Sequence, residues 1–232
     1  MILPTLNEAD HLSATLRRLR QLAGGESLSG RKTRGGDSYE IIVVDGGSSD
    51  GTQDIARSSG VRLVCCTRGR ARQMNEGARH ARGESLYFLH ADTLPPLDWL
   101  ERLRRHGPLP CCFSLRFAGQ ARRPLLRLYA SFTRYDLPAF RFGDQSLWVL
   151  REDFRAVGGF PDWQLLEDNE LVRRLRRYRG FIVLDGHVTT SPRKYLRYGL
   201  VRTQTVYVIL YVLYRLGAGQ TRLSKVYRRL LG

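Results

Sequence analysis

The segment Leu86-Tyr87-Phe88-Leu89-His90-Ala91-Asp92 decides the fold of this chain. Leu86 to Leu89 has the composition of a short buried strand, and the chain turns polar directly after it. Ligands of an open α/β sheet bind at the carboxyl ends of its strands, so His90 and Asp92 occupy a candidate binding position. A helix N-cap at Asp92 is the simpler explanation of these residues taken alone. The neighbouring segments therefore decide between the two interpretations.

Strand-like and helix-like segments alternate on both sides of this segment. We predict strands at residues 1–4, 39–45, 61–66, 86–89, 111–117, 145–150 and 181–184. We predict helices at residues 12–22, directly after 51, and at 69–81, 99–105, 124–134, 152–157 and 171–178. Residues 23–38 are polar and glycine-rich, as expected of a solvated loop. The alternation predicts an α/β fold built on a doubly wound, mostly parallel sheet. The first strand shows only its end, so the start of the chain is expected to be truncated.

The amino-acid composition excludes disordered and fibrous proteins, and the net charge limits the classes of binding partner. The chain has 232 residues, enough for one large domain, and it is 42% hydrophobic and 26% charged. Its formal net charge of +16 comes almost entirely from arginine and favours polyanionic partners such as nucleotide phosphates, nucleic acid or an anionic membrane surface.

The four cysteines form two adjacent pairs, Cys65-Cys66 and Cys111-Cys112, in apolar strand-like runs. Neighbours on a strand point to opposite faces, and zinc sites use other spacings. We therefore expect buried, reduced cysteines. With no secretory segment at the beginning of the sequence, this predicts a cytoplasmic protein.

The segment 195–216 contains an unbroken apolar run, Val206 to Tyr214, flanked by Arg202 and Arg215. The run is less than half of the roughly 20 residues that a membrane-spanning helix needs. It suits a helix packed on the core or on a second subunit. It also suits a helix lying in an anionic membrane interface, which is our hypothesis for peripheral contact at the inner face of the cell membrane.

Four groups of polar residues are candidates for a site. Asp45 ends a strand before a Gly/Ser/Asp turn, where a carboxylate either caps the turn or accepts the imide proton of a uracil-type base. Arg70 and Arg72 are either solvated charges or phosphate ligands. Glu167 and Asp168 begin a helix, where they cap it or supply a general base. His187 is either structural or a metal ligand beside Asp92, and Asp92 offers the oxygen that a hard divalent cation prefers.

The order of these motifs resembles family 2 glycosyltransferases of GT-A fold. The motifs are Pro4-Thr5-Leu6-Asn7-Glu8, the segment Val43 to Thr52, His90-Ala91-Asp92 and Glu167-Asp168. The closer resemblance is to the bacterial subgroup called radical-SAM/selenodomain-associated transferase 2. It is carried by the segments 69–75, Gly143-Asp144-Gln145 and Leu166 to Leu171.

The resemblance implies a nucleotide-sugar enzyme that uses Mg²⁺ or Mn²⁺. The implied catalytic residues are Asp168 and Glu167, the implied acceptor ligands are Asp144 and Gln145, and the implied metal ligands are Asp92 and His187. The residues implied for the nucleotide sugar are Pro4, Thr5, Asn7, Glu8, Asp45, Gly47, Ser49, Asp50, Arg70, Arg72, His90, Ala91 and Asp92. Two departures matter: His90 replaces the first acid of the usual DxD motif, and the QxxRW motif of processive polymer synthases is absent.

We therefore expect a GT-A domain at residues 1–190 and a C-terminal helical extension at 191–232. Residues 1–95 form the nucleotide-binding half and residues 96–190 the acceptor-binding half. The expected reaction is an inverting, metal-dependent transfer of a sugar, from a nucleoside diphosphate that we expect to be UDP, to a hydroxyl acceptor for which a lipid-linked compound is one candidate. The alternatives are a nucleotidyltransferase, although no lysine follows the first strand, and a non-catalytic basic module that binds nucleic acid or membrane. We expect no specific nucleic-acid partner.

Overall fold

The computed structural model describes residues 1–22, 31–32, 38–136 and 145–231. Its strands are β1 (Ile2–Thr5), β2 (Arg31–Lys32), β3 (Ser38–Tyr39), β4 (Ile42–Asp45), β5 (Arg62–Cys65), β6 (Ser85–Phe88), β7 (Thr93–Leu94), β8 (Cys111–Phe117), β9 (Leu147–Leu150) and β10 (Ile182–Thr190). Its helices are α1 (Ala9–Leu22), α2 (Thr52–Ser58), α3 (Arg70–His80), α4 (Trp99–His106), α5 (Pro124–Phe132), α6 (Arg151–Ala156), α7 (Glu167–Tyr178), α8 (Arg193–Tyr198), α9 (Leu200–Arg215) and α10 (Gln220–Leu231), with a 3-10 turn at Gln120–Arg122.

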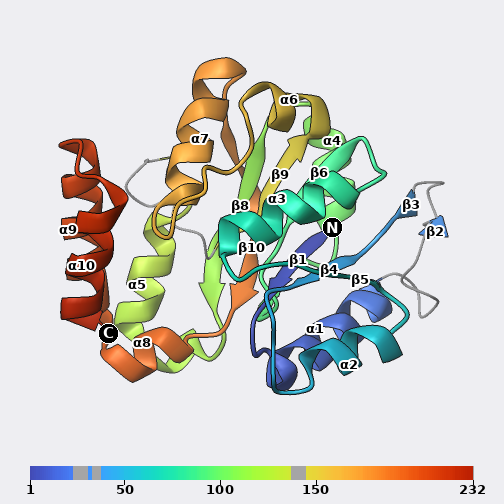
Figure 1. The fold of residues 1–232 in the computed structure, drawn as a ribbon, viewed down its shortest axis with the longest axis horizontal. Coiled ribbons are helices and arrows are strands. Elements are labelled where there is room, and N and C mark those ends of the chain that lie inside the picture. Colours follow the sequence, from blue (N-terminus) through green and yellow to red (C-terminus); the bar gives the residue numbers. More distant parts are fainter. Residues whose placement is uncertain (23–30, 33–37, 137–144, 232) are drawn as a thin grey trace.

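One sheet organises the molecule, with the strand order β5-β4-β1-β6-β9-β8-β10-β7 (Figure 1). The strands β5, β4, β1 and β6 are parallel, and so are β8 and β10. β9 inserts antiparallel between β6 and β8, and the short β7 pairs antiparallel with the end of β10. The predicted α/β class and mostly parallel sheet are confirmed. The periodicity of the sequence did not predict the antiparallel insertion.

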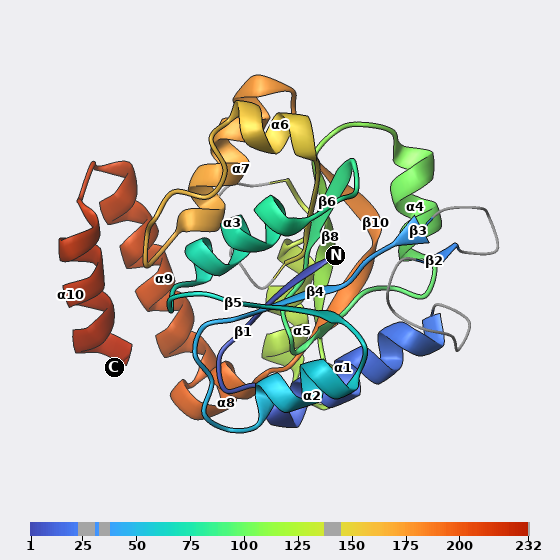
Figure 2. The ribbon, with the colours of Figure 1, turned by 45° about the vertical axis from the view of Figure 1, so that its right-hand side comes forward.

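Helices cover both faces of the sheet (Figures 1 and 2). Alternate residues of each strand point to opposite faces, so Leu3 and Val43 pack with α1, α4 and α5, whereas Ile2, Ile42 and Val44 pack with α3, α6 and α7. Cys111 and Cys112 follow the same rule, and each is buried in a different one of these two cores. The expectation of buried cysteines is wrong for Cys65, which is exposed because β5 lies at the edge of the sheet.

Two local differences from the sequence prediction have simple causes. The last strand does not end at residue 184 but continues to Thr190 past a register shift, because its extension keeps pairing with β8. Residues 31–32 and 38–39, predicted as part of a loop, pair as the small β2–β3 ribbon. Pairing between distant segments decides both features, and local composition does not report it.

The C-terminal helices form a unit of their own beside the sheet. Leu210 of α9 and Leu223 of α10 pack together, and Leu166, which precedes α7, is buried with them. The opposite side of α9 is exposed, including Val201, Val208 and Val212. Within the described residues, the helices are too short or too polar to cross a membrane.

Candidate active site

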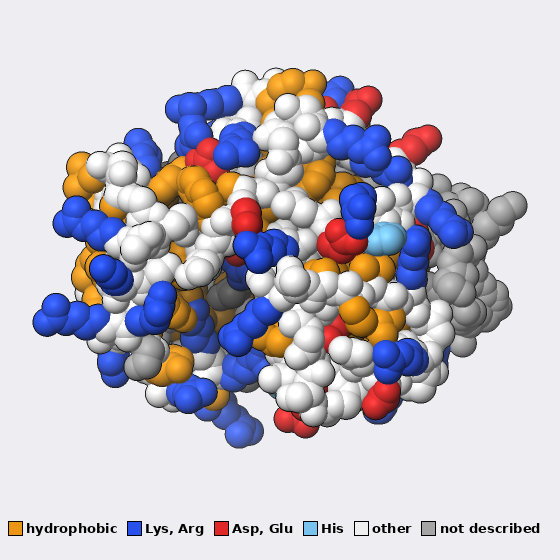
Figure 3. All heavy atoms as spheres, in the orientation of Figure 1, with side chains coloured by type: hydrophobic (Ala, Val, Ile, Leu, Met, Phe, Trp, Pro, Cys, Tyr) orange, Lys and Arg blue, Asp and Glu red, His pale blue; other side chains and the backbone are white. Residues whose placement is uncertain are grey.

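A crevice of about 190 Å³ opens at the carboxyl ends of β1 and β6. Four of its residues belong to the predicted loops: Glu8 after β1 and His90 to Asp92 after β6. The crevice is lined by Pro4, Glu8, Arg70, His90, Ala91, Asp92, Thr190, Ser191, Arg193, Lys194 and Tyr195. In Figure 3, basic side chains surround a hollow on this face, near the place where α3 and α7 begin in Figure 1. We call this the donor crevice.

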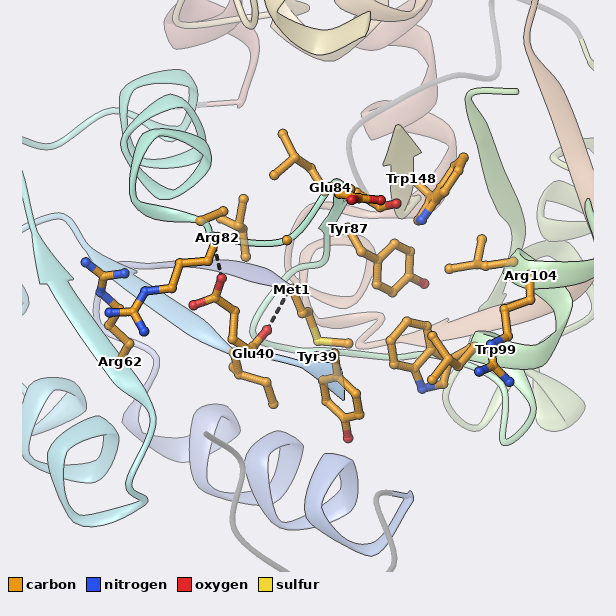
Figure 4. Close-up of a pocket in the computed structure, with 18 residues that line it drawn as sticks. Met1, Tyr39, Glu40, Arg62, Arg82, Glu84, Tyr87, Trp99, Arg104 and Trp148 are labelled. Carbon is orange, nitrogen blue, oxygen red and sulfur yellow. Dashed lines mark hydrogen bonds between the residues drawn. The ribbon is translucent and has the colours of Figure 1, made fainter. Parts of the chain in front are cut away.

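A larger cavity, of about 980 Å³, lies at the other end of the same strands (Figure 4). Its wall includes the aromatic side chains of Tyr39, Tyr87, Trp99 and Trp148. The predicted site residues are absent from its described lining, and the amino ends of parallel strands are not where α/β sheets bind ligands. The candidate site is therefore the smaller donor crevice and not this larger cavity.

The carboxylate of Asp45 is fully buried at the end of β4, beside Thr5 of β1. Its Oδ1 accepts hydrogen bonds from the N–H groups of Gly47 (3.0 Å) and Ser48 (2.8 Å) and from Gln53 Nε2 (2.7 Å). Its Oδ2 accepts from Ser48 Oγ (2.5 Å) and Thr5 Oγ1 (3.1 Å). Burial raises the pKa of this carboxyl, but the hydrogen bonds from Ser48, Gln53 and Gly47 outweigh burial, and the net pKa is lowered. Asp45 therefore caps the turn after β4 through its side chain.

The loops after β1 and β4 hold each other through polar contacts. Asn7, at φ +53°, donates its N–H to Ser48 Oγ (2.8 Å) and accepts through Oδ1 from the Ser49 N–H (3.0 Å). Asp50 accepts from the Thr52 hydroxyl (2.5 Å) and from the N–H groups of Ala9 (3.0 Å) and Thr52 (3.1 Å), and these hydrogen bonds lower its pKa. Asn7, Ser49 and Asp50 thus shape the loop that carries Glu8 into the crevice. Any nucleotide contact they make would be additional.

Arg70 connects the donor crevice to the two acids at the beginning of α7. Its Nε donates to Glu167 Oε1 (2.5 Å), and its Nη2 donates to Asp168 Oδ2. The Glu167 side chain is 2% exposed and that of Asp168 17%. Glu167 Oε2 is buried and has no hydrogen-bond partner among the residues that the structure describes. The structure therefore brings Arg70, Glu167 and Asp168 together, as members of one site should be.

Arg193 joins the other two acids of the crevice. Its guanidinium binds Glu8, with Nη1–Oε2 at 2.8 Å and a second bond from Nη2 to Oε1, and Nη2 lies 3.4 Å from Asp92 Oδ2. Both acids are about 15% exposed. Asp92 also faces the hydroxyl of Thr190, at 3.5 Å. Two acid pairs, each bridged by one arginine, are thus the main electrostatic feature of the crevice.

The crevice offers the oxygen ligands that Mg²⁺ and Mn²⁺ prefer. Asp92 and Glu8 supply carboxylates, and Thr190 supplies a hydroxyl. Within the described residues, no three His, Cys, Asp or Glu side chains cluster closely enough to hold an ion on their own. The residues therefore fit a cation that a bound diphosphate would help to coordinate.

His187 does not join this site. It lies within β10 rather than after it, lines a different cavity, and its Nε2 is 3.2 Å from Arg116 Nη1. Burial, together with the charges of Arg116 and Arg102, lowers its pKa. Because β10 is longer than predicted, His187 does not line the crevice with Asp92, and its position does not support the metal role expected of it.

Arg72 and Gln145 also point elsewhere, and Asp144 lies outside the described residues. Arg72 forms a two-pronged ion pair with Asp162 on the surface (2.8 and 2.7 Å) and does not line the crevice. Gln145 donates from Nε2 to the Thr133 carbonyl (3.3 Å). Arg72 therefore anchors the loop before the acid pair, and the phosphate role predicted for it is not supported by its position.

Sequence reasoning missed the roles of four residues around the site. Arg193, Lys194 and Tyr195 reach the crevice from the segment after β10, which was assigned only to a helical extension. Asn75 was quoted in a motif without a role. It clamps the backbone of Phe160, donating from Nδ2 to the carbonyl (2.8 Å) and accepting from the N–H (3.0 Å). The arginine-lysine pair directly after a polar strand end was the available signal for the first group.

This geometry agrees with what the chain is similar to. Residues 1–106 match the sequence profile of Glycosyl transferase family 2. Over this part of the chain the sequence is similar to glycosyltransferase family 2. Similar proteins include the glycosyltransferase AglE of Haloferax volcanii, 30% identical over 109 residues, which are 44% of this chain and 33% of that protein. An undecaprenyl-phosphate 4-deoxy-4-formamido-L-arabinose transferase of Edwardsiella ictaluri is 32% identical over 111 residues, 44% of this chain and 31% of that protein. The chain spans about a third of the length of these relatives.

Solved glycosyltransferases share the fold. The mannosyltransferase PcManGT from Pyrobaculum calidifontis, in complex with GDP-Man and Mn²⁺, superposes with a TM-score of 0.64 at 21% identity, over 97% of this chain and 68% of that one. S. aureus TarS 1-349 in complex with UDP-GlcNAc superposes with a TM-score of 0.61 at 15% identity, over 90% of this chain and 65% of that one. Identities this low show the fold alone, and the expected fold class is confirmed.

Proposed function

We propose that this protein is a family 2 glycosyltransferase that transfers a sugar from a nucleoside diphosphate to a hydroxyl acceptor with inversion at the anomeric carbon. One observation carries the proposal: residues of two sequence motifs, Pro4 to Glu8 and His90 to Asp92, line a single crevice at the carboxyl ends of the strands, and Arg70 ties that crevice to Glu167 and Asp168. Acids brought together from separate loops suit a reaction in which one pair faces a diphosphate and another faces an acceptor.

In this proposal the sugar donor lies across the loops after β1, β4 and β6. Arg193 and Lys194 face the diphosphate, and Pro4, His90 and Ala91 form the floor of the crevice. Residues 1–95 would thus form most of the donor-binding half, and residues 96–190 would form the acceptor-binding half. The segment that begins at residue 191 would form the remaining wall of the crevice. The buried carboxylate of Asp45 would have to break its hydrogen bonds with the turn in order to bind a nucleotide base. We therefore propose that Asp45 orients Thr5, whose hydroxyl donates to it.

A Mg²⁺ or Mn²⁺ ion would be held by Asp92, with Glu8 beside it. When bound, the ion would act as a Lewis acid that offsets charge on the leaving diphosphate. Solved neighbours of this fold contain Mn²⁺, which supports a divalent ion without identifying it. Arg193 would then exchange its contact with Asp92 for one with the phosphates, a role suited to a guanidinium.

Asp168 is proposed as the general base. Its side chain is partly exposed at the beginning of α7, where it can reach an acceptor, while Glu167 is buried. Asp168 would take the proton of the acceptor hydroxyl as that oxygen attacks the anomeric carbon from the face opposite the diphosphate. Arg70 keeps both acids oriented by charge-assisted hydrogen bonds.

Asp168→Asn tests the assignment directly. A general base contributes about 10²- to 10⁴-fold, so we expect turnover to fall by at least two orders of magnitude while the sugar donor still binds. Asp162→Asn is the matched control, because Asp162 is an exposed acid of the same loop that pairs only with Arg72 among the interactions described. Turnover would be followed with a panel of UDP- and GDP-sugars and Mn²⁺, and donor binding by thermal shift. Wild-type turnover in Asp168→Asn would exclude this base.

We also propose that the protein acts in the cytoplasm with peripheral contact to an anionic membrane. The exposed apolar residues of α9 and its flanking arginines support this. Flotation with vesicles containing anionic lipid would test the contact, and a protein left entirely at the bottom of the gradient would exclude it. No specific observation favours the nucleotidyltransferase or nucleic-acid alternatives.

A further inference from the structure

A groove of about 450 Å³ separates α7 from α9, beyond the acid pair. Its volume is within the usual range for small-molecule sites, about 300–1,000 Å³. α7 lines one side and α9 the other, and the loop before α7 contributes Trp163. The lining residues are Trp163, Asn169, Glu170, Val172, Arg173, Arg176, Arg177, Tyr211, Tyr214 and Arg215. We call this the α7–α9 groove.

The groove carries an excess of positive charge. Its lining contains four arginines and one acid, Glu170. Glu170 is already satisfied, because it accepts from Arg173 (2.6 and 2.7 Å), Arg174 (2.8 Å) and the Tyr214 hydroxyl (2.5 Å). Arg177 and Arg215 form no ion pair with any residue in the described part of the chain. Two guanidinium groups are therefore available to an anionic ligand, and phosphate is the anion that their planar geometry suits best.

The same groove has an aromatic wall and an apolar border. Trp163 packs against Tyr214 with ring centroids 5.9 Å apart, and the Arg215 guanidinium lies 6.0 Å from the Tyr211 ring centroid. On α9, Val208 and Val212 are one helical turn apart and exposed. Helical spacing places this pair directly beside Tyr211 and Arg215. A ligand with an anionic head in the groove would therefore find an apolar path for its remainder along α9.

The position of the groove relates it to the reaction. Asn169 follows Asp168 directly, and Arg173 and Arg177 lie five and nine residues beyond Asp168 on the same helix. At 1.5 Å per residue, these separations correspond to about 8 and 13 Å along α7. A phosphate held by these arginines is too far from Asp168 to be the nucleophile itself. It is well placed to hold an acceptor whose reacting hydroxyl belongs to a sugar attached to that phosphate.

We propose that the α7–α9 groove binds the phosphate or diphosphate head of a lipid-linked sugar acceptor, with the lipid chain lying over Val208 and Val212. This inference rests on the proposed function for its role in catalysis, but not for the binding itself. It assigns a task outside the donor crevice to Arg177 and Arg215, which lack an ion pair among the described residues; Arg215 donates only to the Tyr211 hydroxyl (3.3 Å). It also gives the exposed side of α9 a specific occupant.

Binding can be measured without any turnover by titrating the purified full chain with farnesyl diphosphate and following tryptophan fluorescence. Trp163 lies in the groove, so we expect saturable quenching that the Trp163→Phe variant lacks. Farnesol and inorganic pyrophosphate, each with only half of the required chemistry, should bind at least tenfold more weakly. Calorimetry provides a second readout that does not depend on Trp163.

The charge-reversal variant Arg177→Glu/Arg215→Glu should bind farnesyl diphosphate at least tenfold more weakly. The matched control is Arg228→Glu/Arg229→Glu, which makes the same charge change at exposed positions of α10. Equal weakening in the two variants would mean that only overall charge attracts the ligand, and would overturn the proposal. Absence of saturable binding to the wild-type chain would overturn it too, and pyrophosphate binding as tightly as farnesyl diphosphate would overturn the lipid part.

A thermal-shift titration with UDP, GDP and Mn²⁺ separates this inference from the proposed function. The groove variant should keep the nucleotide response of the wild type, because Arg177 and Arg215 do not line the donor crevice. If the wild-type chain shows no nucleotide response but binds farnesyl diphosphate through the groove, the proposed function fails and the groove assignment stands.

Discussion

The side-chain amide of Gln220, at the beginning of α10, holds the backbone of Leu165 from both sides. Its Oε1 accepts from the Leu165 N–H (3.3 Å), and its Nε2 donates to the Leu165 carbonyl (3.2 Å). Leu165 is two residues before Glu167, and Leu166 between them is buried among Leu210 and Leu223. The C-terminal helices therefore fix the segment that presents the proposed catalytic acids.

Gln220→Ala should loosen this segment without disturbing the donor crevice. The loss of two hydrogen bonds costs about 1–3 kcal/mol of the free energy of unfolding, at about 0.5–1.5 kcal/mol each. We expect turnover to fall severalfold while the nucleotide thermal shift stays that of the wild type. Lys225→Ala, at an exposed position of the same helix, is the control. If Gln220→Ala lowers nucleotide binding as much as turnover, then the C-terminal helices support the whole site rather than the acid pair.

Arg193→Gln should raise the affinity of the chain for Mn²⁺ in the absence of nucleotide. The substitution removes the positive charge that lies between Glu8 and Asp92, leaving both carboxylates to a metal ion. Because these groups are partly solvated, we expect a gain of about three- to tenfold, equivalent to roughly 1 kcal/mol. Titration of the free ion by electron paramagnetic resonance measures it. Arg72→Gln, which removes an arginine that pairs with Asp162, should leave the affinity unchanged. A lower Mn²⁺ affinity in Arg193→Gln would show that Arg193 does not compete with the ion.

Glu170 makes stability depend on pH in the acid range. Burial raises the pKa of this carboxyl, but its hydrogen bonds with Arg173, Tyr214 and Arg174 outweigh burial and lower the pKa to about 2 from an ordinary value of 4.5. A lowered pKa in the folded state stabilises the protein fully above about pH 4.5, and this contribution is lost as the pH falls toward 2. Its size is on the order of 3 kcal/mol.

Glu170→Gln should therefore be destabilised relative to the wild type at pH 7, with the difference shrinking toward pH 2.5. Urea unfolding at several pH values measures both free energies. The exposed Glu152, substituted to Gln, is the control, because its contact with Arg179 at 3.4 Å lies at the surface. A difference between wild type and Glu170→Gln that does not change with pH would show that Glu170 contributes through packing rather than through its charge.

Gly77→Ala should destabilise the protein although alanine favours helices. A Cβ at this position of α3 would lie 2.4 Å from Ile2 Cγ2 and 3.0 Å from Val44 Cγ2, so the helix or the sheet must shift. Overpacking costs typically 1–3 kcal/mol, against about 1 kcal/mol gained in helix propensity. We expect a net loss of about 1 kcal/mol in urea unfolding. Arg79→Ala, at an exposed position of the same helix, should change stability by less. A stabilised Gly77→Ala variant would mean that α3 lies farther from β1 than the structure places it.

The parallel core and most strand ends could be predicted because their signals are local. Buried strands show as short apolar runs, and the turns after Thr5 and Asp45 show as glycine and short polar residues. Local signals do not determine the role of Asp45. The sequence left two roles open for this carboxylate, a cap or a base ligand, and the five hydrogen bonds that make it a cap are visible only in the structure.

The neighbours of His187 and Arg193 could not be predicted from local sequence. The short apolar run at 181–184 predicted a strand end at the wrong place, because pairing with β8 extends β10 to Thr190. That extension leaves His187 beside Arg116 and brings Arg193 to Glu8, a residue 185 positions earlier in the chain. Strand order and register set such meetings, and neither is a property of a short window of sequence.

By itself, the sequence determined most of the segments that become strands of the main sheet and the acids that follow several of them. The tertiary structure alone decided how the acids are grouped: Glu8 with Asp92 through Arg193, and Glu167 with Asp168 through Arg70. The reason is physical. Backbone preference and apolar periodicity act over a few residues, whereas the partners of these charges lie roughly 100 to 185 residues away and meet only when the sheet has set its strand order.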